Sequence, residues 1–374
     1  MAGTNGKGST AAMLAAILRR GGHVVGTMPS PHLGSYTERI QIDGTPISER
    51  EFAGAVESLR PRLEGLPAGL GPPTEFEILT TVAISHLAQR CDRLVIEVGM
   101  GGRLDATNVL DFGLAIITNV ALDHQQYLGD TLVQIAAEKA GIIKPGNLVI
   151  TGAGGEALEV VESAAASAGA QLWRLGDELR LQVRWRGWEG SEIDLAGPGF
   201  VDSNLRVPLL GSHQAMNAAL AVAAAHALGE TPDGLAEARW PGRLELVADH
   251  PPVLLDGGHN PAALARLAED VPRLADGRPV TVVFGTMADK DITAGLAELR
   301  RLRPAGIVFT AAQSPRAARP GDLAAAWGGG EVVLPATAAA DRGVELAGPR
   351  GLVLVCGSLY VVGEVRPGLV AKPR

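Results

Sequence analysis

MAGTNGKGST, residues 1–10, is the stretch of sequence on which the rest of the fold depends. Glycines at positions 3, 6 and 8 let the backbone turn where a Cβ atom would clash, so successive N–H groups can converge on an anion. Lys7 would add a positive charge, and Ser9 or Thr10 a hydroxyl group for a magnesium ion. The pattern predicts a phosphate-binding loop. The alternative interpretation is a flexible glycine-rich tail.

The residues after this loop have the composition of a helix. The run from Ala11 to Arg20 is rich in alanine and leucine and stops at Gly21-Gly22. The N-terminal dipole of such a helix favours a phosphate group at the loop. A secretory signal is disfavoured, because the apolar run is short and ends in two arginines.

Length and composition narrow the class of protein. A chain of 374 residues suits two domains. Aromatic residues make up only 4% and the formal net charge is -8, which argues against a nucleic-acid partner. Cys91 and Cys356 are too few for a disulfide framework, so a reducing cytoplasm is expected. Apolar stretches fall short of the roughly 18 residues of a membrane helix, so no membrane partner is expected.

Polar residues stand where predicted strands end. Residues 94–96 form an apolar run that ends on Glu97, and residues 114–117 form another that soon reaches His124. Ligands of parallel sheets bind at the carboxyl ends of strands, so both side chains are candidates to face the phosphate loop, with Ser30 as a third. The three could hold magnesium, although imidazole is an unusual ligand for so hard an ion. The alternatives are a helix cap, a structural histidine and a serine that fixes a proline turn.

Further helices are predicted from their first turns. The acidic segment 74–77 begins a helix over residues 78–89, as the helix dipole prefers. Residues 131–141 form another, with Leu132, Ile135 and Ala136 on one face and Gly141 at its end. Lys139 in this helix could, on its own, be a surface cation.

The second half of the chain predicts a second α/β unit. Alternation over residues 172–207 indicates antiparallel strands, and the clearest break in the chain is at 231–234. Past it, apolar strands at 253–255, 280–284, 306–310 and 352–355 alternate with helices. We therefore predict an α/β protein with a mainly parallel sheet in a first domain, residues 1–235, and a smaller α/β domain, residues 236–374.

Short motifs in a fixed order resemble those of the folylpolyglutamate synthase/dihydrofolate synthase branch of the Mur ligase superfamily. They are GTNGKGS (3–9), SPHL (30–33), EVGMGGRLDATN (97–108), LDH (122–124), EKAGI (138–142), GSHQAMN (211–217), PGRLE (241–245) and DGGHNP (256–261). The resemblance implies a P-loop ATP-binding domain of the Mur ligase type and a Rossmann-like C-terminal domain.

The resemblance also implies an activity in folate biosynthesis and one-carbon metabolism. A carboxylate of dihydropteroate or of a reduced folate would attack the γ-phosphate of ATP to give an acyl phosphate, which the amine of L-glutamate displaces. The cofactors would be ATP and Mg2+, with K+ as a further candidate. The enzyme would be a cytoplasmic monomer, and we favour the bifunctional form over a folylpolyglutamate synthase alone.

Individual residues take roles by the same resemblance. The expected ATP contacts are Thr4, Asn5, Gly6, Lys7, Gly8, Ser9, Asn217, Arg243 and Asp256. The expected metal ligands are Ser30, Glu97 and His124. The expected catalytic residues are Lys7, His259 and Lys139, the last as a carboxylated lysine. The expected pterin or folate contacts are Thr74, Glu75, Phe76, Glu77, Leu104, Asp105 and Ala106.

Two of these residues could bind a pterin ring by known types of contact. Phe76 could stack on a flat pterin ring, and Asp105 could accept hydrogen bonds from ring N–H groups. Both could instead be structural. Because Arg243 and Asp256 would come from the linker and the second domain, the site is expected to be completed by domain closure.

Departures from the family pattern leave alternatives open. Pro29 and Gly258 replace the usual residues without removing a ligand. The family has a helical segment and a first strand ahead of the phosphate loop, so we expect a longer native chain, and weak or no activity if Met1 is the true start. The rival functions are another Mur-type amino-acid ligase of cell-wall synthesis and an N-terminally truncated nucleotide-binding protein without activity.

Overall fold

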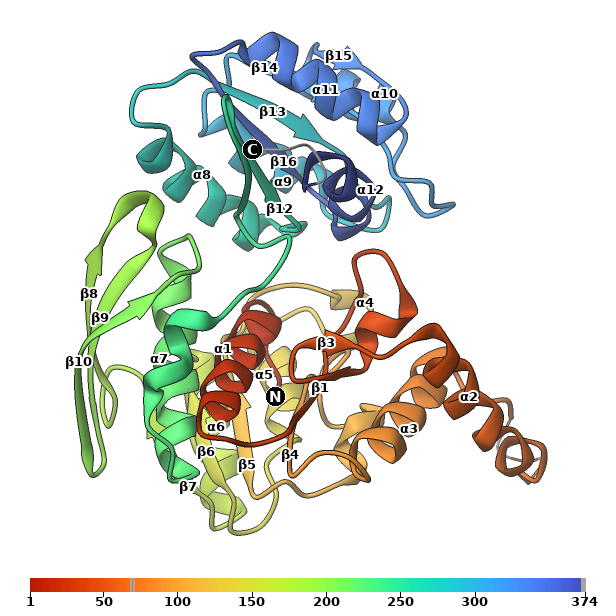
Figure 1. The fold of residues 1–374 in the computed structure, drawn as a ribbon, viewed down its shortest axis with the longest axis vertical. Coiled ribbons are helices and arrows are strands. Elements are labelled where there is room, and N and C mark those ends of the chain that lie inside the picture. Colours follow the sequence, from red (N-terminus) through yellow and green to blue (C-terminus); the bar gives the residue numbers. More distant parts are fainter. Residues whose placement is uncertain (68, 70, 371–374) are drawn as a thin grey trace. The chain divides into compact units, whose positions relative to one another are not determined.

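The structure, a computed structural model, describes residues 1–67, 69 and 71–370. Its contacts divide the chain into two compact units (Figure 1). Unit 1 comprises Met1–Arg184, Glu192–Pro208 and Gln214–Arg239, and unit 2 comprises Trp185–Ser191, Leu209–His213 and Trp240–Arg374. These are units of packing, and the domain boundary expected between residues 235 and 236 stays a prediction.

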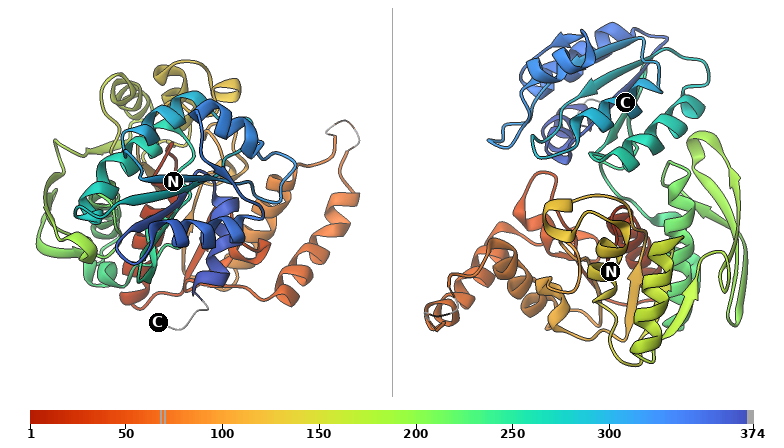
Figure 2. Two further views of the ribbon diagram at one scale, coloured as in Figure 1. Left: turned by 90° about the horizontal axis from the view of Figure 1, so that it is seen from above. Right: turned by 180° about the vertical axis from the view of Figure 1, so that it is seen from behind.

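Unit 1 alternates helices with short strands. In chain order its elements are α1 (Lys7–Arg20), β1 (Val25–Met28), η1 (Tyr36–Arg39), β2 (Gln41–Ile42), β3 (Thr45–Pro46), α2 (Glu49–Glu64), α3 (Glu75–Leu87), β4 (Arg93–Ile96), η3 (Ala106–Val109), β5 (Leu114–Ile117), α4 (Gln125–Leu128), α5 (Leu132–Ala140), β6 (Leu148–Thr151), α6 (Glu156–Ser167), β7 (Gln171–Arg174), β8 (Arg180–Trp185), β9 (Ser191–Gly197), β10 (Phe200–Val207), α7 (His213–Ala227) and η5 (Pro232–Glu237). Helices α2 and α3 lie side by side and project from the rest of the unit (Figure 2).

The strands of unit 1 form separate sheets. One has the order β3-β2-β1-β4, in which β1 and β4 are parallel, and another has the order β5-β6-β7, which is parallel throughout. The prediction of antiparallel strands over 172–207 is therefore wrong at its start, because β7 continues the parallel sheet. The rest of that region forms the sheet β10-β9-β8.

The first two residues of the chain lie between two of these sheets. The Met1 ammonium donates to Ile96 O (3.0 Å), and Met1 O accepts from Val98 N (2.9 Å), at the end of β4. Ala2 N donates to Ile116 O (2.8 Å), and Ala2 O accepts from Thr118 N (3.0 Å), at the end of β5. The phosphate loop is thus attached to the carboxyl ends of both strands.

Unit 2 is built on one mainly parallel sheet with the order β11-β12-β16-β13-β14-β15. Its elements are η4 (Gly187–Glu189), β11 (Glu245–Asp249), β12 (Pro252–Asp256), α8 (Pro261–Ala275), β13 (Val280–Phe284), α9 (Ile292–Arg300), β14 (Gly306–Phe309), α10 (Pro320–Trp327), β15 (Glu331–Val332), α11 (Ala336–Ala347), β16 (Leu352–Cys356) and α12 (Leu359–Val370). β11 pairs with β12 in the antiparallel sense, and the other strand pairs described in this sheet are parallel. The α/β class predicted from the sequence is confirmed.

The core of unit 2 explains why its strands are continuous apolar runs. Every residue of β13 and β16 is buried, as expected when helices cover both faces of a parallel sheet. Helices α11 and α12 pack on each other and on the sheet, and α8 packs with α9 (Figures 1 and 2). In the part of the chain that the structure describes, no helix is long and apolar enough to cross a membrane.

Candidate functional site

The loop before α1 has a backbone that only glycine can adopt without strain. Gly6, at the N-cap of α1, has φ 84° and ψ -11°, in the left-handed region. A Cβ atom on Gly6 would lie 2.3 Å from Asn217 Oδ1, and one on Gly3 would lie 1.9 Å from Thr118 Oγ1. The loop is therefore packed against neighbouring side chains at both glycines, and the interpretation as a flexible tail does not fit this structure.

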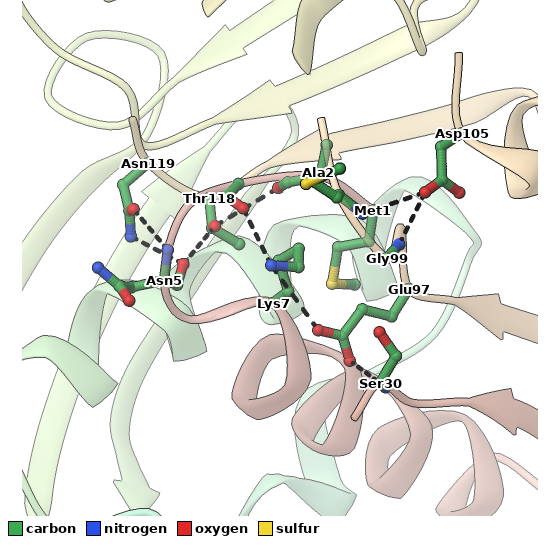
Figure 3. Close-up of polar contacts among 12 residues, drawn as sticks. Met1, Ala2, Asn5, Lys7, Ser30, Glu97, Gly99, Asp105, Thr118 and Asn119 are labelled. Atoms are coloured by element: carbon green, nitrogen blue, oxygen red, sulfur yellow. Dashed lines mark hydrogen bonds and ion pairs between the residues drawn. The ribbon is translucent and has the colours of Figure 1, made fainter. Parts of the chain in front are cut away.

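The segment that follows β5 holds the loop in place (Figure 3). Asn119 binds Asn5 twice, since its Oδ1 accepts from Asn5 N (3.0 Å) and its Nδ2 donates to Asn5 O (2.9 Å). Thr118 Oγ1 also donates to Asn5 O (2.6 Å). Thr4 Oγ1 donates to Ala121 O (3.1 Å) and accepts from Ala121 N (2.9 Å). These hydrogen bonds leave the backbone of the loop little freedom before α1 begins.

Sequence reasoning did not nominate Thr118 and Asn119 as site residues. They shape the loop from a position more than a hundred residues along the chain. The sequence does contain one signal for them: they are polar residues that directly follow the apolar strand β5. Polar residues at that position of a parallel sheet often face the ligand site.

The first turn of α1 is open to an anion. The first N–H groups of any α-helix lack partners within the helix, and at α1 Gly6 provides no side-chain cap. Ser9 and Thr10 are buried, so the helix enters the interior of the unit directly after the loop. Backbone N–H groups and the positive end of the helix dipole therefore converge where a phosphate group would bind.

Lys7, Glu97 and Ser30 meet beside this loop (Figure 3). Lys7 Nζ donates to Gly3 O (3.0 Å) and lies 3.9 Å from Glu97 Oε1. Glu97 is 3% exposed, and its Oε2 accepts from Ser30 N (3.2 Å). Glu97 directly follows β4 and Ser30 lies two residues after β1, so adjacent parallel strands bring these side chains together. Ser30 and Glu97 thus lie together beside Lys7, and their role as metal ligands stays a prediction.

The third expected metal ligand, His124, lies in the segment after β5. It is the N-cap residue of α4 with φ 52°, and its imidazole Nε2 lies 3.9 Å from Asp123 Oδ1. Within residues 1–67, 69 and 71–370, no group of three or more His, Cys, Asp and Glu side chains is arranged to hold a metal ion. Any metal bound here would therefore take further oxygen ligands from Ser30 or from its own substrate, and the predicted set stays a prediction.

Lys139 is buried and not on the surface. It is 3% exposed, because it lies on the same face of α5 as Ile135, which packs into the interior. Burial, together with the positive charge of Lys7 and against the opposing effect of Asp123, lowers the pKa of the Lys139 ammonium to about 7. The interpretation of Lys139 as a surface cation is wrong, and a large share of its amine is neutral at neutral pH.

The predicted pterin contacts of α3 mostly build the start of that helix. Thr74 Oγ1 accepts from Glu77 N (3.2 Å), and Glu77 Oε2 accepts from Thr74 N (2.7 Å), which is a capping box. Glu75 Oε1 accepts from the Tyr36 hydroxyl (3.1 Å). Phe76 covers Gly99 so closely that a Cβ atom there would lie 2.5 Å from its ring. Their contacts with a substrate stay a prediction.

The second group of predicted pterin contacts lies in the loop after β4. Asp105 Oδ2 accepts from Gly99 N and Met100 N (both 3.1 Å), and Oδ1 accepts from Thr107 N (3.0 Å) and Thr107 Oγ1 (2.6 Å). Both carboxylate oxygens therefore order the loop itself. Leu104 is 80% exposed and Ala106 begins η3. Whether these residues touch a pterin stays a prediction.

Unit 2 contains the remaining predicted site residues except Asn217. Asp256, at the end of β12, accepts from Leu244 N (2.7 Å) and Gly258 N (2.6 Å), so it joins the segment around Arg243 to this strand. Arg243 Nη1 donates to Gly242 O (3.3 Å), and His259 Nδ1 lies 3.0 Å from Gly257 O. Asn217, in unit 1, donates to Gln214 Oε1 (3.0 Å) and packs on Gly6. Their shared role in one ATP site stays a prediction.

Comparison with known families agrees with this arrangement. The Mur ligase middle domain matches residues 1–225, and the Mur ligase glutamate ligase domain matches residues 242–359. The loop, the sheet edges and the second α/β unit are therefore those of a Mur ligase.

Similar proteins with known names indicate which branch of the Mur ligases this chain resembles. The dihydrofolate synthase/folylpolyglutamate synthase of Bacillus subtilis is 35% identical over 99% of this chain and 89% of its own length, and that of Escherichia coli is 35% identical over 100% and 86%. The Mycobacterium tuberculosis folylpolyglutamate synthase, solved with ADP and AMPPCP, is 34% identical with a TM-score of 0.93 over 100% of this chain and 91% of its own. The chain belongs to the dihydrofolate synthase/folylpolyglutamate synthase family of Mur ligases.

Proposed function

We propose that this protein is an ATP-dependent ligase that joins L-glutamate to dihydropteroate, to reduced folates or to both. The observation that carries the proposal is the open N-terminus of α1 behind a rigid glycine loop, with Lys7 and the buried Glu97 beside it. The relatives named above support the acceptor, since an E. coli member, 33% identical and covering 99% of this chain, was solved in complex with DHPP and ADP. The matching glutamate ligase domain supports glutamate as the amine.

The loop residues would bind and orient the nucleotide. The N–H groups of the first turn of α1 and the Lys7 ammonium would neutralise the charge of the β- and γ-phosphates, and the hydrogen bonds from Thr118 and Asn119 hold this arrangement before the nucleotide arrives. The acceptor carboxylate attacks the γ-phosphorus and ADP leaves. The glutamate amine then attacks the acyl carbon, and inorganic phosphate leaves as the amide forms and the amine loses a proton.

The donor set beside the loop fits magnesium. Glu97 offers a buried carboxylate and Ser30 a hydroxyl, and such hard oxygen donors suit Mg2+, with His124 as a less usual third ligand. Bound there, Mg2+ would neutralise phosphate charge. A role for K+, a monomeric state and a cytoplasmic location are further parts of the proposal that come from the family resemblance alone.

Lys139 is suited to become a carboxylated lysine. A neutral amine, which the lowered pKa of about 7 provides, can attack CO2 to form a carbamate and release one proton. The product would carry a negative charge near Lys7 and Asp123, whose charges already affect the pKa of Lys139. The adduct would then help to position the cation and phosphate groups.

The test is a coupled phosphate-release assay with ATP, Mg2+ and glutamate, with dihydropteroate or tetrahydrofolate as acceptor. We expect phosphate release that requires both the acceptor and glutamate, with one amide bond formed per phosphate. Phosphate release with a cell-wall nucleotide acceptor but neither pterin would contradict the folate assignment. Absence of ATP binding would contradict the whole proposal.

A further inference from the structure

Asp270 is a buried carboxylate that the proposed chemistry does not use. It lies on α8 of unit 2 and is 1% exposed. Its Oδ2 accepts from Ser212 N (2.9 Å) and Ser212 Oγ (3.2 Å), and it lies 3.6 Å from His213 Nδ1. Burial raises the pKa of Asp270, but the nearby His213 ring and the hydrogen bonds from Ser212 outweigh it, so its pKa stays below its ordinary value and the group is ionised at neutral pH.

The residues that Asp270 holds are the ones that begin α7. The short segment Leu209–His213 belongs to unit 2, and from Gln214 onward the same helix belongs to unit 1. A negative charge at the N-terminus of a helix is favourable, so Asp270 also stabilises the first turn of α7. Gly211 has φ 106°, and a Cβ atom there would lie 2.6 Å from His213 Cε1, so this turn has one tightly defined shape.

One turn further along, α7 contacts the phosphate loop. Asn217 lies four residues after His213, and residues at this spacing share one face of a helix. Asn217 Nδ2 donates to Gln214 Oε1 (3.0 Å), and both side chains are buried. A Cβ atom added to Gly6 would lie only 2.3 Å from Asn217 Oδ1. A small shift in the start of α7 would therefore move Asn217 against the loop.

The same helix α8 also contacts the segment Trp185–Ser191, which belongs to unit 2. The Arg273 guanidinium, three residues after Asp270, stacks 4.6 Å from the centre of the Trp185 ring. Trp185 and Trp188 pack on the core of unit 2, although the strands β8 and β9 on either side belong mainly to unit 1. Within unit 2, the face of α8 with Asp270 and Arg273 thus contacts both short segments, Trp185–Ser191 and Leu209–His213.

We propose that Asp270 is a positioning residue for nucleotide binding: by holding Ser212 and His213 at the start of α7, it keeps Asn217 in register with Gly6 of the phosphate loop. The inference rests on the proposed function of that loop. Asp270 acts through α7 and not on the nucleotide, and coupling along such a packed element typically changes affinity by about twofold to thirtyfold.

The chain offers a matched control at the other end of the same helix. His226, near the C-terminus of α7, pairs with Asp202 Oδ2 at 2.7 Å. Asp202→Ala thus removes a carboxylate that pairs with a histidine of α7, as Asp270→Ala does, but far from Asn217. If Asp270 contributes only to folding, the two substitutions should act alike on nucleotide affinity.

The experiment is calorimetric titration of the full chain with ADP and Mg2+, together with the melting temperature of each variant. We expect Asp270→Ala to weaken ADP binding by about tenfold, Asp270→Asn, which keeps an acceptor oxygen, to recover most of it, and Asp202→Ala to stay within about twofold of the wild type. Equal ADP affinity in Asp270→Ala and the wild type would overturn the inference, and so would equal losses in Asp270→Ala and Asp202→Ala.

Two further variants keep the inference testable. Asp270→Ala should add no further loss when Asn217→Ala is already present, because both act through one contact, whereas fully additive losses would overturn it. If Asp270→Ala does not fold, Ser212→Ala removes one of the two hydrogen bonds and should weaken ADP binding by about threefold, and wild-type affinity in that variant would overturn the inference. A wild-type chain that fails to bind ADP would instead refute the proposed function, and this inference with it.

Discussion

Two loop-to-helix junctions of this chain, the one that enters α1 and the one that enters α8, look alike in sequence and differ in how their helix ends are satisfied. Both follow glycine-rich segments. At α8, Asn260 Oδ1 accepts from Ala263 N (2.8 Å) and Pro261 occupies the first helical position. At α1, Gly6 gives no side-chain cap. An N–H group in the first turn of α8 already has a side-chain acceptor, whereas the first turn of α1 has no side-chain cap and is available to a ligand.

Helices α2, α3 and α5 of unit 1 also begin with side-chain caps. Ser48, Thr74 and Thr131 cap α2, α3 and α5 through complete capping boxes. Helices α4 and α6 also begin without a side-chain cap, so what distinguishes α1 is the tightly packed glycine loop before its start, with Lys7 beside it. Substitutions at the start of α1 should therefore weaken nucleotide binding, whereas substitutions at the start of α8 should lower stability and leave binding nearly unchanged.

The largest effect is expected for Lys7→Ala. It removes the positive charge beside the phosphate site and leaves the buried Glu97 without its ion pair. We expect the rate of glutamate-dependent phosphate release to fall by about 100-fold or more. Lys144→Ala is the control, since Lys144 binds Asn108 O at the other side of the loop after β4. A rate for Lys7→Ala within twofold of the Lys144→Ala rate would contradict the assignment of the loop.

Gly6→Ala should come next. The new Cβ atom would be 2.3 Å from Asn217 Oδ1, and φ 84° would be strained for alanine, so we expect ADP binding to weaken by about tenfold or more and the melting temperature to fall. Gly277→Ala is a matched control, because Gly277 has φ 82° and no atom within 4 Å of the added Cβ. It should lose stability by about 1 kcal/mol and keep its ADP affinity. Similar ADP affinities in both variants would show that the contact with Asn217 is unimportant.

The lowered pKa of Lys139 predicts that the stability of the protein depends on pH. Its pKa is about 7 in the folded protein and 10.5 is the ordinary value, so between these pH values the unfolded chain binds more protons. The free energy of unfolding of the wild type, relative to Lys139→Met, should therefore rise with pH from 7 to 10.5, by up to about 1.4 kcal/mol per pH unit. Denaturant titrations in CO2-free buffer measure this difference. A difference that is flat across this range would mean that the lysine is charged in the folded state.

The smallest effect is expected at the capped junction. Asn260→Ala removes the acceptor for Ala263 N and should lower the free energy of unfolding by about 1 kcal/mol. Because this cap serves the helix, binding of inorganic phosphate should change by less than about twofold. Asn260→Asp, which keeps the acceptor, should restore the stability. A loss of phosphate binding without loss of stability would make the start of α8 a binding site too.

The phosphate loop and the strand-end residues could be predicted because their signals are local. The glycine spacing and Lys7 indicate the loop, and the position of Glu97 directly after an apolar strand indicates a site residue. The structure adds what local signals do not contain. Lys139 reads as a surface residue until its helix is packed, and the contact of Asn217 with Gly6 joins positions far apart in the sequence.

The acceptor residues show a further limit. A capping box and an acidic first turn have one pattern whether or not a ligand is present, so Thr74 and Glu77 look equally suited to either role. Asp105 is similar, because its four hydrogen bonds stay inside the loop that it orders. Resemblance to the family is what suggests that these residues face the substrate.

Amide hydrogen exchange with and without ADP and Mg2+ tests the central contrast most directly. We expect ADP to slow exchange at the N–H groups of Lys7, Gly8 and Ser9 by about tenfold or more, because the phosphates become their acceptors. Exchange at Ala263 N, which Asn260 already satisfies, should change by less than about twofold. Unchanged exchange at Lys7, Gly8 and Ser9 under saturating ADP would contradict the account.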